Sequence, residues 1–180
     1  MNITKPVMNT SRKPKPSSSK KTPIAARDLF ASPWSFLGLG FGTGLAPKAP
    51  GTFGTLAALP LYALLAGLDA EYYLTATILL FLIGIPICSK TEKVIGIQDH
   101  SGVVWDEIVG FLITMSFVVP SAISLALGFI LFRFFDVIKP WPIRWFDQRV
   151  HGGFGIMLDD AIAGVMACVM TNYGLAHLLQ

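Results

Sequence analysis

The chain has 180 residues and a mass of 19.5 kDa, with 53% hydrophobic residues, 14% charged residues and a mean hydropathy of +0.60. Soluble domains carry about 25% charged residues, so this chain lacks the charge to cover a globular surface in water. The same numbers exclude a disordered, fibrous or disulfide-based protein. They favour a small integral membrane protein.

Residues 1–31 form a polar segment that differs from the rest of the chain. Residues 1–28 carry seven basic side chains and one acidic one, whereas the remainder carries seven basic and ten acidic side chains. The segment has no apolar stretch typical of a secretory signal, and its Lys-Pro and Ser-rich composition predicts a disordered basic tail. The pI near 9.0 therefore reflects the tail and does not indicate nucleic-acid binding. We expect a single domain over residues 32–180.

Apolar runs dominate this domain, and they predict an almost entirely helical fold. Two of them, 72–89 and 161–180, are long enough to cross a bilayer. A third, 49–68, begins with Pro50 and two glycines, so we expect its helix to start near Thr55 and to last about 14 residues.

The connections between the runs predict an orientation. Residues 69–71 carry two acids and no base, whereas the connection 90–107 contains Lys90 and Lys93. Basic connections favour the cytoplasmic side, so we expect the tail and 90–107 inside and 69–71 outside.

The run 108–132 allows two topologies, because Pro120 interrupts it. A single straight helix of this length would measure about 37 Å and would place its ends on opposite membrane faces. Two halves of about 18 Å each would instead turn back at Pro120. Both halves are apolar all round, so periodicity alone does not choose between them.

Acidic residues gather in three segments that adjoin the apolar runs: 98–107, 133–147 and 151–160. A lone carboxylate beside an apolar helix is costly unless it is protonated or neutralised by a cation. Hard carboxylate oxygens suit Mg²⁺ or Mn²⁺, and no His/Cys pattern indicates zinc. The candidate metal ligands are Asp106, Glu107, Asp136, Asp159 and Asp160.

Basic side chains are interleaved with these acids, as a phosphate site requires. Arg133, Asp136 and Lys139 share one helical face, and Arg144 follows within reach. Lys48 lies in a glycine-rich segment, 38–55, that leads into a helix and could bind an anion. We predict that the phosphate-binding residues are Lys48, Arg133, Lys139 and Arg144.

Two histidines lie beside the acid clusters on predicted loops. His100 and His151 are candidates for general acid or base catalysis, because imidazole titrates near neutral pH. Asp99 precedes His100 and is a further candidate for the base. The two cysteines, Cys88 and Cys168, lie in apolar runs and predict packed thiols.

Four stretches of the chain form a recognisable set of motifs: Pro47-Lys48-Ala49-Pro50-Gly51-Thr52, Trp105-Asp106-Glu107, Asp136-Val137-Ile138-Lys139-Pro140-Trp141-Pro142-Ile143, and His151-Gly152-Gly153 through Asp159-Asp160. In this order they resemble the phosphatidylglycerophosphatase A family, and the resemblance extends over residues 36–172. It implies an all-α fold and a Mg²⁺-dependent lipid phosphatase of the bacterial inner membrane. Such an enzyme converts phosphatidylglycerophosphate to phosphatidylglycerol and phosphate in phospholipid biosynthesis.

Chemistry then suggests metal-assisted hydrolysis, in which water attacks phosphorus and Asp99 or His100 takes its proton. Asp136 would serve both the metal and catalysis, and an aspartyl-phosphate route stays open. For the acids to meet, 108–132 must form a bent or re-entrant hairpin near Pro120, with the polar metal site at one membrane face, the cytoplasmic one. The expected partners are the lipid substrate and the bilayer. The alternatives are a CDP-alcohol phosphotransferase and a cation channel or transporter.

Overall fold

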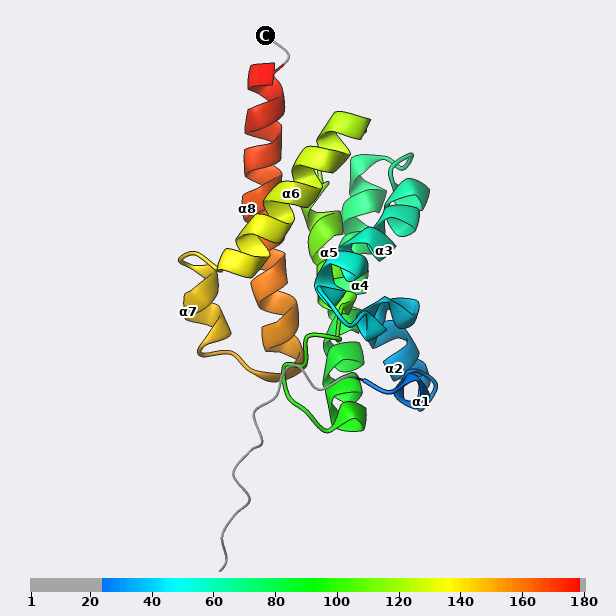
Figure 1. Cartoon of the computed structure of the whole chain (residues 1–180). Helices are drawn as coiled ribbons and strands as arrows, with labels where there is room; N and C mark the ends of the chain where they lie inside the picture. Colours follow the sequence, from blue (N-terminus) through cyan, green and yellow to red (C-terminus); the bar gives the residue numbers. More distant parts are fainter. Residues whose placement is uncertain (1–23, 179–180) are drawn as a thin grey trace, which may run out of the picture.

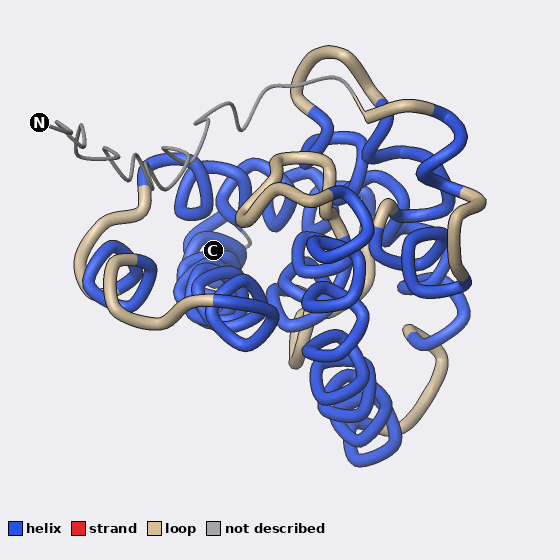
Figure 2. The backbone as a smooth tube through the Cα atoms, turned by 90° about the horizontal axis from the view of Figure 1, so that it is seen from below, coloured by secondary structure: helices blue, strands red, loops and turns tan. Residues whose placement is uncertain are grey.

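The structure is a computed structural model that describes residues 24–178. Within this range every regular element is a helix, which confirms the all-helical fold (Figures 1 and 2). Residues 1–23 of the predicted tail lie outside the described residues. The helices are α1 (Ala26–Leu29), α2 (Pro33–Gly38), the 3₁₀ helix η1 (Gly40–Leu45), α3 (Pro50–Leu65), α4 (Ala70–Ile95), α5 (Trp105–Thr114), α6 (Ala122–Ile138), α7 (Ile143–Asp147) and α8 (Gly152–Leu178).

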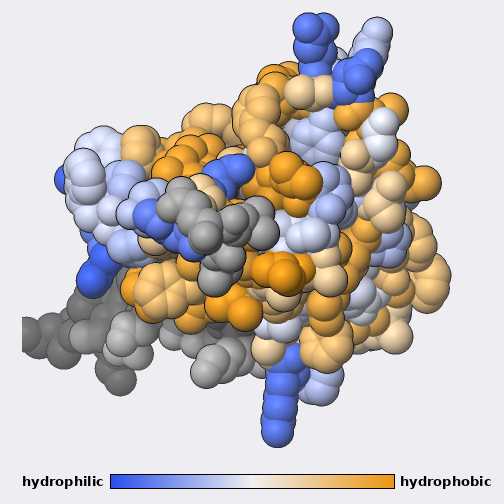
Figure 3. Space-filling model, turned by 90° about the horizontal axis from the view of Figure 1, so that it is seen from above, coloured by the Kyte–Doolittle hydropathy of each residue, from blue (hydrophilic) through white to orange (hydrophobic). Residues whose placement is uncertain are grey.

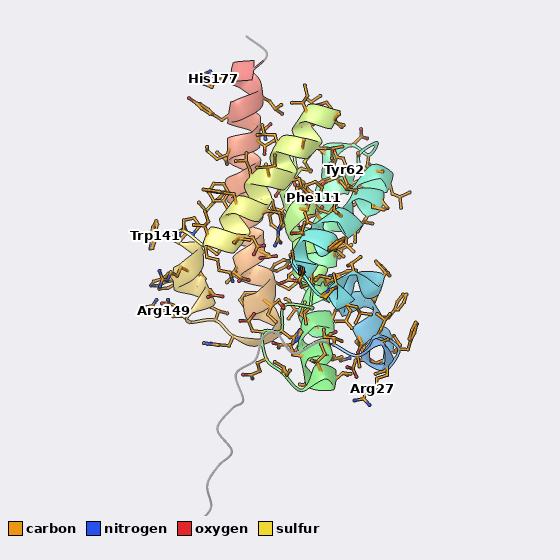
Figure 4. All side chains as sticks on the ribbon, viewed as in Figure 1. Arg27, Tyr62, Phe111, Trp141, Arg149 and His177 are labelled. Atoms are coloured by element: carbon orange, nitrogen blue, oxygen red, sulfur yellow. The ribbon has the colours of Figure 1, made fainter. Side chains whose placement is uncertain are left out.

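The short helix α5 lies at the centre of the bundle, with α3, α4, α6 and α8 around it (Figure 1). Nine of its ten residues are buried, because a helix that is apolar all round is stable only when it is surrounded. Phe111 on α5 packs edge-on against Tyr62 of α3, with ring centroids 6.3 Å apart (Figure 4). The central helix therefore fixes the positions of its neighbours.

Glycines allow α5 and α8 to approach each other closely. A Cβ on Gly164 of α8 would lie 2.5 Å from the carbonyl oxygen of Gly110 on α5, and a Cβ on Gly110 would lie 3.0 Å from the carbonyl oxygen of Asp160. Small residues at such a crossing let two backbones touch. The crossing brings the acidic turn of α8 beside the acidic first turn of α5.

The chain reverses direction between α5 and α6, over residues 115–121. Phe117 takes a left-handed conformation there, with φ of 60°, and Ser121 caps α6 by accepting a hydrogen bond from the amide of Ser124. Pro120 thus separates two helices. As a result, the start of α5 and the end of α6 lie near each other (Figure 1).

The predicted start of the helix in run 49–68 is wrong. Helix α3 begins at Pro50 and not near Thr55. Proline is well suited to a first helical turn, because its missing N–H would have no partner there. Gly51 and Gly54 are tolerated because their lack of side chains lets the helix approach Glu107 and Val104 closely.

Helices α4 and α8 are each long and apolar enough to cross a membrane, with hydropathies of 1.9 and 1.6 in their most apolar windows. Both exceed the runs predicted from the sequence. Apolar side chains also spread over much of the surface seen from the end where α8 finishes (Figure 3). Large apolar side chains such as Leu79 and Leu82 on α4 and Val165 on α8 are exposed, so the outer faces of these helices are suited to contact with lipid.

Candidate active site

A small cavity of about 100 Å³ lies where α5, α6 and α8 meet the loop that precedes α5. Six carboxylates line it, against a single lysine, so its lining carries an excess of negative charge. The ionisable residues around it are Asp99, His100, Asp106, Glu107, Asp136, Lys139, Asp159 and Asp160.

Three of these acids meet closely enough to share one cation. Asp106 and Glu107 are each 9% exposed and Asp160 is 3% exposed. One carboxylate oxygen from each lies within 4.8 Å of the others. Asp106 Oδ1, Glu107 Oε2 and Asp160 Oδ2 are buried without a hydrogen-bond partner. Buried oxygens without donors are what a cation would satisfy, so this cluster could hold a metal ion.

Burial disfavours negative charge on the first turn of α5. It raises the pKa of the Asp106 carboxyl well above its usual range, and the neighbouring carboxylate of Glu107 adds to the rise. The pKa of Glu107 is raised in the same way by burial and by the charge of Asp160. The ionised forms of these groups thus need a positive neighbour.

Arg133 of α6 supplies positive charge on one side of the cluster. Its Nη1 lies 2.5 Å from Asp136 Oδ2, one helical turn further on, and 3.8 Å from Glu107 Oε1. Arg133 is not itself among the lining residues, but both acids that it contacts are. A guanidinium held by Asp136 in this way has a fixed orientation and offsets negative charge beside the cavity.

Lys139 supplies the second positive charge, at the end of α6. Its Nζ pairs with Asp159 Oδ2 in the cavity and, at 2.7 Å, with Asp147 Oδ1 of α7. Burial alone lowers the pKa of Lys139, but these two carboxylates outweigh burial and raise the pKa above the ordinary lysine value. The ammonium group therefore stays charged between two helices.

Two helices direct their amino-terminal ends at the cavity. Asp106 and Glu107 lie in the first turn of α5. Gly51 lies in the first turn of α3, where a Cβ would come within 2.2 Å of Glu107 Oε1 and 2.9 Å of Arg133 Nη1. Amino-terminal helix ends favour negative charge, which helps to offset the crowding of carboxylates and would also favour a bound phosphate.

The loop before α5 is held by side-chain hydrogen bonds. The buried carboxylate of Glu92 on α4 accepts a hydrogen bond from the amide of Asp99, which has a left-handed φ of 51°. Nδ1 of His100 accepts a hydrogen bond from the amide of Gly102 at 3.0 Å. In a neutral imidazole this bond places the proton on Nε2, so His100 is suited to donate a hydrogen bond through Nε2.

The remaining predicted site residues lie outside the small cavity. Lys48 lines a larger neighbouring cavity of about 510 Å³ that also contacts His100. His151 lines another, of about 430 Å³, together with Asp99 and Asp159. Arg144 is exposed on α7 and lines none of these three cavities. Its neighbours Trp141 and Arg149 also project from the bundle (Figure 4).

Three residues around the cavity were missing from the sequence-based prediction. Asp147 holds Lys139, Glu92 holds the loop of Asp99, and Gly51 lets α3 approach the acids. Glu92 is a buried carboxylate between two basic residues in a long helix. An acid in this position was the signal from which the sequence could have indicated a role for Glu92. Asp147 gives no signal of its own, because its partner lies on another helix.

The chain matches the family described as phosphatidylglycerophosphatase A over residues 36–174. The chain belongs to this family. Phosphatidylglycerophosphatase A of Escherichia coli (strain K12) is 46% identical over 143 residues, which cover 79% of this chain and 83% of the relative. The protein of the same name from Haemophilus influenzae is 44% identical over 142 residues, covering 77% and 86%.

A third relative, from Bacteroides thetaiotaomicron, is provisionally named a phosphatidylinositol-3-phosphatase. It is 38% identical over 143 residues, covering 74% of this chain and 88% of the relative. No solved structure matches the chain. Membership of the phosphatidylglycerophosphatase A family favours a lipid phosphatase over the phosphotransferase and ion-path alternatives.

Proposed function

We infer that this chain is a phosphatidylglycerophosphatase, a phosphoric monoester hydrolase that forms phosphatidylglycerol in phospholipid biosynthesis. Water attacks the terminal phosphorus of phosphatidylglycerophosphate, the bond from phosphorus to the glycerol oxygen breaks, and phosphatidylglycerol and inorganic phosphate leave. The observation that carries this function is the cluster of three buried carboxylates with unsatisfied oxygens, flanked by Arg133 and Lys139.

The resident cation is Mg²⁺, held by Asp106, Glu107 and Asp160. The donor set fits, because all three ligands are hard oxygens that lack a donor within the described residues. When bound, Mg²⁺ neutralises charge on the phosphomonoester and makes its phosphorus more electrophilic. Asp136 and Asp159 lie in the same cavity but pair with Arg133 and Lys139. They orient the side chains of Arg133 and Lys139, and their carboxylates could serve as further ligands of the same cation.

The side chains around the cluster bind the phosphate, donate a hydrogen bond and accept the proton of water. Arg133 and Lys139 bind the phosphoryl oxygens and stabilise the charge that develops on them. His100 donates a hydrogen bond through Nε2, since its Nδ1 is occupied by the amide of Gly102. The proton of the attacking water passes to Asp99, which lines the cavity. His151 lines the neighbouring 430 Å³ cavity together with Asp99, so it influences Asp99 and does not contact the phosphate.

The protein is a multi-pass protein of the bacterial inner membrane, in which α4 and α8 cross the bilayer. Asp69 and Glu71 lie at the start of α4, whereas Lys90 and Lys93 lie near its other end, which leads to the loop of Asp99 and His100. Basic residues favour the cytoplasmic side. This distribution supports a site at the cytoplasmic face, with α5 and α6 forming a hairpin that returns to it.

The test is phosphate release from phosphatidylglycerophosphate by the purified protein in detergent, with Mg²⁺ and with EDTA. We expect release to require Mg²⁺ and to fall at least 100-fold in Asp160→Asn, because loss of one ligand removes much of the metal affinity. Asp69→Asn is the matched control, since Asp69 is exposed beside α4 and far from the cavity.

Phosphatidylinositol 3-phosphate serves as the competing lipid. Faster hydrolysis of that lipid than of phosphatidylglycerophosphate would contradict the proposed substrate. Release that persists in EDTA would contradict the proposed metal.

A further inference from the structure

The small cavity has room for only one end of the substrate. Phosphatidylglycerophosphate carries a terminal phosphomonoester, a three-carbon glycerol link, and then a phosphodiester that leads to the acyl chains. A space of about 100 Å³ accommodates a phosphate and its cation, so the diester and the chains must lie in an adjoining space. Two larger cavities share lining residues with the small one.

One of these adjoining cavities is acidic. The 430 Å³ cavity shares Asp99, Ile156 and Asp159 with the small one, and Glu92 and Asp147 also line it. Lys139 offsets the charges of Asp147 and Asp159, while no lysine or arginine lies among the lining residues. A phosphodiester anion that entered this cavity would meet like charge.

The other adjoining cavity has the opposite character. The 510 Å³ cavity shares His100 and Ser101 with the small one, and its lining contains Lys48 and no acid. The rest of its wall is backbone and apolar side chains such as Leu45 and Pro47. A cavity with one cation, two neutral polar residues and an otherwise apolar wall is complementary to an anionic diester attached to a lipid.

The wall of this cavity is set by a tight backbone contact. A Cβ on Gly44 would lie 2.0 Å from the carbonyl oxygen of Gly102, so η1, which leads into the segment of Lys48, packs directly on the loop that carries His100. This contact holds the backbone near Lys48 beside the loop that borders the small cavity. A substrate whose two phosphates are separated by a short link requires two neighbouring binding sites.

We propose that the 510 Å³ cavity binds the phosphodiester end of the lipid substrate, with Lys48 as the residue that recognises the diester. This inference rests on the proposed function and extends it. It assigns Lys48 to the phosphodiester, which the product retains, and not to the phosphomonoester that is cleaved. Lys48 is then a specificity-determining residue that selects a lipid with a second phosphate at the correct distance.

The experiment uses two inhibitors, each of which represents one end of the substrate. Dihexanoyl phosphatidylglycerol carries the diester alone, and inorganic phosphate represents the cleaved end. Inhibition constants are measured on release of labelled phosphate from phosphatidylglycerophosphate by the full chain in detergent with Mg²⁺. The proteins are the wild type, Lys48→Met, Lys48→Arg and, as a matched control, Lys93→Met, whose exposed lysine lies on α4 outside this cavity.

We expect Lys48→Met to weaken inhibition by the short lipid about tenfold, as loss of one charge-assisted hydrogen bond predicts, and to change inhibition by phosphate less than about twofold. Lys48→Arg retains most of the affinity, and Lys93→Met resembles the wild type. Weakened inhibition by phosphate alone, unchanged inhibition by both, or no inhibition of the wild type by the short lipid would each overturn the proposal.

Failure of the proposed function is separately visible. If the wild type releases no phosphate, binding of the short lipid is measured instead as a shift in melting temperature of the same proteins. A shift that Lys48→Met reduces then supports the diester site even though the phosphatase assignment fails. Equal shifts in the wild type and Lys48→Met overturn the diester site as well.

Discussion

Asp106, Glu107 and Asp160 are placed where they oppose folding and serve catalysis. Each is buried, each has an oxygen without a hydrogen-bond donor, and the three are close enough to repel one another when ionised. Such a cluster destabilises the fold unless its acids are protonated or share a cation, so its presence points to function. Activity and stability should therefore respond in opposite directions when one acid is neutralised.

We expect Asp106→Asn to raise the melting temperature of the metal-free protein by about 2–4 °C, the shift that roughly 1 kcal/mol produces in a chain of this size. The same variant should lose phosphatase activity, because a neutral amide binds Mg²⁺ weakly. Melting is followed in EDTA and in Mg²⁺, with the exposed Glu71→Gln as control. A lower melting temperature in EDTA would contradict the idea that charge crowding destabilises the cavity.

Asp147 illustrates a residue that acts through its partner. It holds Lys139 from α7 while Asp159 holds the same ammonium from α8. Because both side chains of the outer pair are partly exposed, at 28% and 36%, the pair is screened by solvent. We expect Asp147→Ala to lower kcat/KM about threefold to tenfold, and Lys139→Met to lower it more than 100-fold. Equal losses in the two variants would instead place Asp147 in direct contact with substrate.

At the scale of elements, the position of α3 depends on a missing side chain. The first turn of α3 contacts the carboxylate of Glu107 and the guanidinium of Arg133 at Gly51. A methyl group there would have to displace backbone or both charged groups, since the contacts would be 2.2 Å and 2.9 Å. The positions of Glu107 and Arg133 therefore limit where α3 can lie, and α3 in turn limits where these two side chains can lie.

We expect Gly51→Ala to lower phosphatase activity at least tenfold, because displacement of a catalytic group by even 1 Å can cost about 100-fold in rate. Gly67→Ala is the matched control, since a Cβ at Gly67 has no heavy atom within 4 Å. Initial rates and melting temperatures are measured for both variants. Full activity in Gly51→Ala would show that α3 can move without disturbing Glu107 and Arg133.

At the scale of the molecule, the reversal between α5 and α6 determines which ends share a membrane face. Cysteines introduced at Gln98 and Gln148, both exposed at the site end, should be labelled from the same side by a membrane-impermeant maleimide. A cysteine at Gly67, at the opposite end, should be labelled from the other side. Cys88 and Cys168 are first replaced by serine or alanine. Labelling of positions 98 and 148 from opposite sides would contradict the hairpin.

The apolar runs were sufficient to predict the helical fold and the group of acids from which the site is built, although α4 and α8 extend beyond the predicted runs. Helix starts were harder, because Gly51 reads as a helix breaker until its contact with Glu107 is known. Lys48 and Arg144 shared the cationic pattern of a phosphate site, but only the fold separates the cavity of Lys48 from the exposed surface of Arg144. The role of Asp147 depends on which segments meet, and local sequence does not encode that, whereas Glu92 offered a signal as an acid within a long helix.

The close crossing of α5 and α8 at Gly110 and Gly164 has a consequence for biogenesis. Asp160 comes from α8, which follows the other described helices along the chain, so synthesis must pass Asp160 before the carboxylates of α5 can share a cation with it. Until then the acids of α5 have no neighbour from α8, and their burial would be costly. The amino-terminal end of α5 should therefore remain in contact with water while the earlier helices insert. Assembly of the cavity therefore has to wait for α8, so a nascent chain that ends before Asp160 could not yet form the metal site.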